Sequence, residues 1–292
     1  MFGECHAHIF MNGYDYQLAV RNQKNGNQEK VIRENLKAYQ EKGITFVRDG
    51  GDHFGASALA KRLAKGYGID YRSPLYSIYK NGHYGKVTGR GFDNMKEYEK
   101  LVDKAILNGA DFIKIMVSGI MDFNKGGLTE DGLKEEYIKE MIHIAHEKGK
   151  AIMVHANGAK TILTCVKAGA DSIEHGNYMD EECIAALIEH KADTAYVPTV
   201  VTIRNLIGDG RFPDEIIKPI WERQKEVINS LYQGGATIAL GSDAGAYRVL
   251  HGQGVEDEFK AIAHIAHTTT SGKVIKARMQ AGEEFIKERF KA

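Results

Sequence analysis

The sequence predicts an α/β protein with the fold of a (β/α)8 TIM barrel. Short apolar or β-branched runs alternate with longer amphipathic helical stretches from one end of the chain to the other. Eight such pairs in 292 residues amount to roughly 36 residues each, which is the size of one barrel unit. No proline- or serine-rich linker and no change of composition divides the chain. We therefore expect residues 1–292 to form a single barrel domain.

The expected strands are short and apolar, as parallel strands covered on both faces should be. They lie at residues 2–5, 43–48, 71–79, 111–117, 151–155, 171–175, 193–198 and 236–241. Good helix formers occupy residues 94–108, 134–148 and 213–232, the last with proline and acidic residues in its opening turn. Glycines that accept a left-handed conformation are expected to end the helices before five strands: Gly43, Gly109, Gly149, Gly169 and Gly235. Residues 268–292 begin with small polar residues and continue as a charged amphipathic stretch, which predicts a C-terminal helical extension.

The composition argues against several classes of partner. Lys and Arg number 39 and Asp and Glu number 39, so there is no global positive field and nucleic acid is not expected to bind. No apolar run approaches the roughly 18 residues that cross a bilayer, and the N-terminus lacks the regions of a signal peptide. We expect a cytoplasmic protein that does not bind membranes and acts on a small molecule; whether it forms a homo-oligomer stays open. The three cysteines are expected to be reduced thiols, because they suggest neither a disulfide framework nor a CxxC site.

Polar side chains stand at the carboxyl ends of the expected strands, where active sites of barrels are built. They are His6, His8, Lys114, His155, His175 and Asp243. Residues i and i+2 of a strand point to the same face, so the first two imidazoles should lie together. Neutral imidazoles and a carboxylate suit Zn²⁺ and related divalent ions, and this set predicts a metal site at the barrel mouth.

Lys114 is the unusual member of this set, because an ammonium group beside a dication is repelled. Burial lowers the pKa of a lysine, and the neutral amine can react with CO₂ to give an anionic carbamate that could bridge two metals. A lysine at this position could also form a Schiff base, as in a class I aldolase of the same fold, although that chemistry leaves the histidines without a role.

The motifs around these residues resemble the amidohydrolase superfamily, in particular its binuclear branch with a carboxylated lysine and its imidazolonepropionase-like and Xaa-Pro dipeptidase-like members. The similar stretches run in order along most of the chain and include Cys5-His6-Ala7-His8, Phe112-Ile113-Lys114-Ile115-Met116, Val154-His155-Ala156-Asn157-Gly158, Asp171-Ser172-Ile173-Glu174-His175-Gly176 and Gly241-Ser242-Asp243-Ala244-Gly245. The resemblance implies a barrel whose metal ions catalyse hydrolysis.

The resemblance also implies a role for each ligand. His6, His8 and Asp243 would hold a first divalent ion, His155 and His175 a second, and a CO₂-derived carbamate on Lys114 would bridge them. A hydroxide between the metals would be the nucleophile, and Asp243 would take its proton and pass it to the leaving amine. Zinc is preferred, while Mn, Fe and Co also suit these ligands.

Substrate contacts are expected from the loops at the same barrel face. The candidates are His83, Tyr196, His251 and Asn157, with Met116, Met121 and Phe123 as lining and Arg90, Arg204 and Arg248 as partners for a substrate carboxylate. Asn157 stands where many relatives have His or Tyr, which leaves the substrate class open. Relatives also carry a β-sandwich built around a longer N-terminus, so we expect a barrel without this accessory domain.

The sequence therefore predicts a metal-dependent hydrolase of the amidohydrolase type that cleaves a C–N bond in an amide, a peptide-like compound or a cyclic amide. Three alternatives remain. Two are enzymes: a mononuclear deaminase of the same superfamily and a lyase that uses Lys114 as a Schiff base. The third is a barrel that binds a small molecule without catalysis. The substrate, the metal, the number of metal ions and the oligomeric state cannot be read from the sequence.

Overall fold

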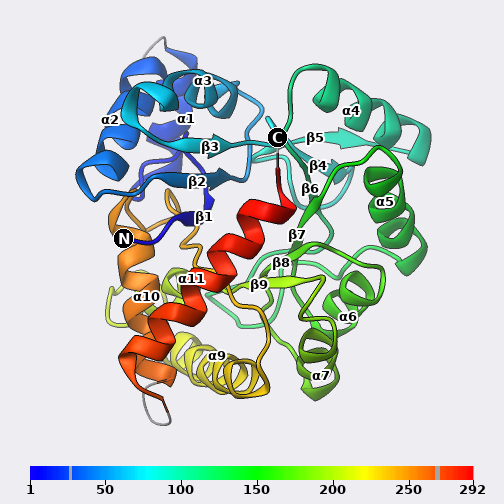
Figure 1. Cartoon of the computed structure of the whole chain (residues 1–292). Helices are drawn as coiled ribbons and strands as arrows, with labels where there is room; N and C mark the ends of the chain where they lie inside the picture. The colour runs from blue at the N-terminus through cyan, green and yellow to red at the C-terminus, as the bar shows by residue number, and fades with distance from the viewer. Residues whose placement is uncertain (26–27, 267–269, 292) are drawn as a thin grey trace.

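Strands and helices alternate along the chain, with the strands at the centre and the helices around them (Figure 1). The computed structural model describes residues 1–25, 28–266 and 270–291. The strands are β1 Glu4–Ala7, β2 Phe46–Asp49, β3 Asp70–Arg72, β4 Ser77–Lys80, β5 Gly89–Phe92, β6 Ile113–Met116, β7 Ile152–Ala156, β8 Ser172–His175 and β9 Ala195–Val197. The helices are α1 Tyr16–Lys24, α2 Gln28–Glu41, α3 Ala56–Leu63, the 3₁₀ turn η1 Ala64–Tyr67, α4 Met95–Leu107, α5 Glu135–Glu147, α6 Ala159–Lys167, α7 Glu181–Glu189, α8 Val201–Arg204, α9 Asp214–Gly234, α10 Gln253–Ala266 and α11 Gly272–Arg289.

The strands form two parallel sheets whose carboxyl ends lie on the same side. One sheet has the order β1-β2-β3 and the other has the order β5-β4-β6-β7-β8-β9. In the larger sheet Lys114 of β6 is paired with Ser77 of β4, and His175 of β8 is paired with Ala156 of β7. This register brings the polar residues at the ends of separate strands to one edge, as the sequence predicted.

The expected strand at residues 236–241 lies between β9 and β1 but is not a regular strand. Tyr196 of β9 donates to Thr237 O at 2.8 Å, and Cys5 of β1 donates to Leu240 O at 2.9 Å. An isolated bridge joins Tyr196 to Ile238, the Ser242 amide just after the segment donates to the Glu4 carboxylate, and α11 packs on the segment. The segment nevertheless joins the two sheets.

The expected strand at residues 71–79 is divided into β3 and β4. Pro74 has no amide hydrogen for a ladder, and Leu75 has a φ of 67° that ends extended pairing. As a result β3 pairs with β2 while β4 pairs with β6, so the bent segment spans both sheets. The pairing strand β5 was not predicted, because its sequence Gly-Arg-Gly-Phe has no apolar run.

The predicted helices are confirmed to within about two residues at each end, and the five predicted glycine stops all have φ between 68° and 88°. Helix α11 confirms the helical part of the C-terminal extension; residues 268, 269 and 292 lie outside the described residues. Its end crosses in front of the strands (Figure 1). Phe290, just after the helix, packs on Phe112, just before β6, with ring centroids 5.3 Å apart. Within the described part of the chain, no helix is both long enough and apolar enough to cross a membrane.

Candidate metal centre

A cavity of about 270 Å³ opens at the carboxyl ends of the strands. All six side chains that the sequence proposed as metal ligands line this cavity: His6, His8, Lys114, His155, His175 and Asp243. They come from β1, β6, β7, β8 and the loop after residue 240, so that segments from both ends of the described fold converge on one site.

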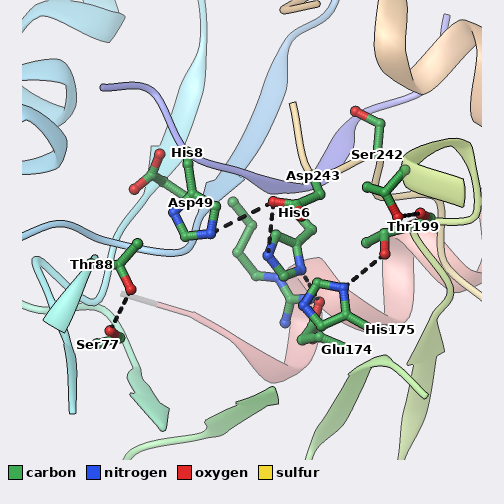
Figure 2. Close-up of polar contacts among 12 residues, drawn as sticks. His6, His8, Asp49, Ser77, Thr88, Glu174, His175, Thr199, Ser242 and Asp243 are labelled. Atoms are coloured by element: carbon green, nitrogen blue, oxygen red, sulfur yellow. Dashed lines mark hydrogen bonds and ion pairs between the residues drawn. The ribbon is translucent and has the colours of Figure 1, made fainter. Parts of the chain in front are cut away.

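His6, His8 and Asp243 form a compact donor group in which one ligand atom from each residue lies within 4.8 Å of the others. The Nε2 atoms of both histidines lie 3.7 Å from Asp243 Oδ1 (Figure 2). Asp243 and His175 have left-handed φ values of 60° and 68°, which non-glycine residues adopt at a cost and mostly at functional sites.

Each of the four imidazoles has one nitrogen held by a group outside the cavity. The contacts are His6 Nδ1 to Glu174 Oε2 at 2.6 Å, His8 Nδ1 to Gly51 O at 3.3 Å, His155 Nε2 to Gly119 O at 3.2 Å and His175 Nδ1 to Thr199 Oγ1 at 2.8 Å. Carboxylate and carbonyl oxygens only accept, so the Nδ1 atoms of His6 and His8 that face them carry hydrogen. The Nε2 atom of each of these two rings then has a free lone pair, which is the arrangement of a metal-binding histidine.

Three buried atoms at the centre of the site have no hydrogen-bond partner among the residues that the structure describes: His6 Nε2, Lys114 Nζ and Asp243 Oδ1. Buried polar atoms are rarely left unpaired, so these atoms fit a site that receives a cation. Burial raises the pKa of Asp243 to about 7 and lowers that of Lys114 to about 8. Burial, followed by the positive Lys114, lowers the pKa of His8 and His155 to about 3, which keeps both rings neutral and able to coordinate.

Glu174 is a site residue to which the sequence interpretation assigned no role. Its carboxylate accepts from Arg48 Nη2 at 2.9 Å and from Ser172 Oγ at 2.5 Å, in addition to the contact with His6. Arg48 and Glu174 are both 0% exposed, so this ion pair is buried. Through Glu174 it holds the Nδ1 side of the His6 ring. A charged residue inside the buried run at 171–175 was the signal that could have identified it.

The predicted substrate contacts are placed differently from the ligands. His83 does not line the cavity; its side chain is 37% exposed and its Nδ1 lies 3.7 Å from Glu130, while the adjacent Tyr84 lines the cavity instead. Tyr196 is fully buried and donates to His175 O at 2.9 Å. Neither residue lines the cavity.

His251 and Asn157 are both committed to internal hydrogen bonds. Both ring nitrogens of His251 are 2.9 Å from protein oxygens, Tyr39 OH and Met11 O. Asn157 lines the cavity, but its Nδ2 donates to Gly119 O at 3.0 Å and its Oδ1 accepts from Asn177. Both residues brace the site, because they have no free polar atom to direct at a ligand.

Apolar side chains form much of the cavity wall, and Met116, Met121 and Phe123 line it as the sequence predicted. The three predicted arginines do not line it: Arg90 stacks on Tyr76 and Arg248 pairs with Asp209, while Arg204 is exposed on α8. A different arginine, Arg211, lines the cavity.

Comparisons with known proteins place the fold and the family. Ochratoxinase of Aspergillus niger is 26% identical over 279 residues, which cover 82% of this chain and 56% of that enzyme, so the chain spans about half the length of this curated relative. The solved structure of A. niger ochratoxinase matches with a TM-score of 0.79 and 20% identity, covering 98% of this chain and 70% of that one. A Xaa-Pro dipeptidase with bound methionine matches with a TM-score of 0.75 and 22% identity, covering 98% and 74%.

These likenesses show that the α/β fold predicted from the sequence matches the TIM-barrel structures of amidohydrolases over 98% of this chain. The amidohydrolase family matches residues 2–281, which is nearly the whole chain. The chain therefore belongs to the amidohydrolase family and is an enzyme of that family.

Proposed function

We propose that this enzyme is a metal-dependent hydrolase that cleaves a C–N bond of an amide-type small molecule. The observation that carries the proposal is the convergence of four imidazoles, one carboxylate and one unpartnered amine in a single cavity. Relatives named ochratoxinase and Xaa-Pro dipeptidase, both C–N hydrolases, support this class of reaction.

The ligands divide between two divalent ions in this proposal. His6, His8 and Asp243 would hold one ion, and His155 and His175 would hold the other, with zinc preferred and Mn, Fe and Co also suited to the donors. Lys114 would serve both ions as a carbamate: its Nζ lone pair bonds to the carbon of CO₂, one N–H proton leaves, and a single negative charge is shared by the two oxygens. The buried Nζ, which lacks any hydrogen-bond partner, supports this modification.

The side chains perform the remaining tasks of hydrolysis. Bound divalent ions supply Lewis-acid chemistry, because they acidify water and polarise the carbonyl of an amide. Asp243 Oδ1 faces the cavity, has no hydrogen-bond partner among the described residues, and would receive the proton of the attacking water and then return it to the leaving amine nitrogen. The apolar walls limit access of bulk water, which strengthens these interactions.

Metal analysis of protein purified without chelator tests the proposal. We expect about two metal equivalents per chain and hydrolysis of members of a dipeptide and N-acyl amino acid library. About one equivalent, together with release of ammonia, would favour a mononuclear deaminase that uses His6, His8, His155 and Asp243. The compact group of His6, His8 and Asp243 keeps this second candidate open. A preparation that is active and free of metal would exclude both.

The Lys114→Ala variant tests the bridging carbamate. We expect loss of activity and of metal uptake, with partial rescue by a short carboxylate, whereas Lys139→Ala on the surface of α5 should behave as the wild type. Full activity of Lys114→Ala would exclude the carbamate. Trapping of a carbonyl substrate on Lys114 by borohydride would indicate the Schiff-base lyase instead.

A further inference from the structure

The walls of the cavity are largely apolar. Apolar side chains from several loops make up the walls, including Val87, Ile120, Met121, Phe123, Leu206 and Phe212. Such a surface favours a bulky aliphatic or aromatic group, because burial of apolar area is favourable and few polar groups compete for it. The metal ligands occupy the base of the same cavity.

Among the residues that the structure describes, Arg211 is the one arginine that lines this cavity. Its guanidinium carbon lies 4.1 Å from the ring centroid of Tyr247 and 5.3 Å from that of Phe212. Stacking on two rings restricts the side chain without using the hydrogen-bond donors at its edge.

Asp209, a carboxylate two residues before Arg211 in the chain, is already engaged by other groups. Its Oδ1 pairs with Arg248 Nε at 2.9 Å, and its Oδ2 accepts from Tyr247 OH at 2.9 Å. The second of these bonds holds the ring on which Arg211 stacks. Within the described ranges 1–25, 28–266 and 270–291, no carboxylate forms an ion pair with Arg211, so the fork of its guanidinium remains open to a ligand.

We propose that Arg211 binds the carboxylate of the substrate, and that the substrate is an amide carrying both this carboxylate and a bulky apolar group. This assignment rests on the proposed function for the identity of the reacting bond. A planar guanidinium binds a carboxylate through two parallel hydrogen bonds, which gives affinity and fixes the orientation. The apolar group then lies against the walls, and the amide is directed toward the ligand set at the base.

Binding and hydrolysis are measured separately to test this role. The binding probes are N-benzenesulfonyl-L-phenylalanine and the corresponding neutral alcohol, N-benzenesulfonyl-L-phenylalaninol. Neither has an amide bond to cleave, and both are titrated by calorimetry into the metal-loaded enzyme. Charge-assisted hydrogen bonds predict about ten- to hundredfold tighter binding of the carboxylate. In Arg211→Met this preference should disappear while affinity for the alcohol stays within about twofold. Arg204→Met, an exposed arginine outside the cavity, is the matched control and should retain the preference.

Hydrolysis of N-benzoyl-L-phenylalanine should show the same change in KM, with kcat of Arg211→Met largely retained, because the arginine binds a remote group. Equal binding of the two probes, no binding of either, or an unchanged preference in Arg211→Met would overturn the role of Arg211. A preference that depends on Arg211 in an enzyme that hydrolyses no amide would support this role and reject the proposed function. Hydrolysis that is indifferent to the carboxylate would do the reverse.

Discussion

Glu174 connects His6 to the interior of the barrel. Its carboxylate bonds His6 Nδ1 on one side and Arg48 on the other, while the guanidinium of Arg48 lies 4.4 Å from the ring centroid of Phe290. The acceptor on His6 Nδ1 directs the lone pair of Nε2 into the cavity. Groups of this kind around a metal ligand set the tautomer and the orientation of the ring.

The Glu174→Gln variant should bind metal about 10–100-fold more weakly, because a neutral amide holds the imidazole less well and leaves Arg48 without a carboxylate. Competition with a chromophoric chelator measures this affinity, and circular dichroism checks that the variant is folded. Glu283→Gln is the control. Glu283 is also buried, it accepts a hydrogen bond of 2.8 Å from Gly3 N, and it does not line the cavity. Equal metal affinity of both variants would show that Glu174 does not position His6.

Glu258 of α10 supports the loop that carries Thr199. Its two oxygens accept from the amides of Val200 and Val201, both at 2.9 Å, and Thr199 contacts His175. Burial raises the pKa of Glu258 from 4.5 to about 8, although the two backbone donors partly oppose the shift. The fully buried carboxyl of Glu258 therefore ionises at a higher pH in the folded state than in the unfolded chain.

This shift has a defined sign for stability. From about pH 5 to about pH 8 the unfolded chain has lost the proton that the folded state retains, so the free energy of unfolding falls as pH rises. Glu258→Gln cannot ionise, and its free energy of unfolding in urea should decline less over this range than that of the wild type. Glu256→Gln on the same helix should follow the wild type, because Lys42 and Lys260 lower the pKa of Glu256 and move its effect below this range. Parallel slopes for wild type and Glu258→Gln would contradict the shift.

Helix α11 is attached to the rest of the fold by polar contacts along its C-terminal half. Glu283 bonds Gly3, Arg289 bonds Asp171, and Arg72 donates to backbone carbonyls near the end of the helix. Gly282 allows α11 to lie directly on the segment between β9 and β1, because a Cβ at this position would overlap the carbonyl oxygen of Ile238. The helix thus covers the segment that lacks regular strand pairing.

Two glycines of α11 should respond oppositely to alanine. Gly282→Ala should destabilise the protein by about 1–3 kcal/mol, because the added methyl group collides with backbone that cannot rotate away. Gly272→Ala meets no atom within 4 Å and should be neutral or stabilising by up to ~1 kcal/mol. Urea unfolding at constant metal concentration measures both changes. Similar effects at the two positions would argue against close packing at Gly282.

At the scale of the molecule, the candidate ligands join segments that lie far apart in the chain. His6 comes from β1, His155 from β7, and Asp243 from the loop that follows the irregular segment 236–241. The unfolded chain does not hold these groups together, so a bound ion favours the folded state.

Metal addition should therefore raise the thermal stability. Zinc at about 100 times its dissociation constant adds about 2.7 kcal/mol, which corresponds to a rise of roughly 5 °C in Tm for a chain of this size. Differential scanning calorimetry of chelator-stripped protein with and without zinc measures the shift. Asp243→Asn should lose most of it, and an unchanged Tm in the wild type would count against a structural link through the metal.

Periodicity and strand-end chemistry predicted much of this protein. The alternation of runs identified the α/β barrel class, the glycine stops marked helix ends, and the six candidate ligands meet in one cavity. These features depend on local patterns, because parallel strands all end at the same edge of the sheet. A polar residue at the end of a strand is therefore placed at that edge. Pro74 can be read from the sequence, but the sequence did not show that the chain bends there and divides its strand pairing between two sheets.

Contacts between distant segments could be found only in the tertiary structure. The sequence contains Glu174, Arg48 and Arg211, yet nothing local indicates that the first two form a buried pair next to His6, or that the third has no carboxylate partner in the described part of the chain. Likewise, His83 and Tyr84 are neighbours in the chain, and only the path of the loop decides which one lines the cavity. The sequence by itself determined the class of fold and the types of donor, because these follow from short-range periodicity. Packing between remote segments decided which polar groups are satisfied and which remain free, since burial and pairing are properties of the assembled chain.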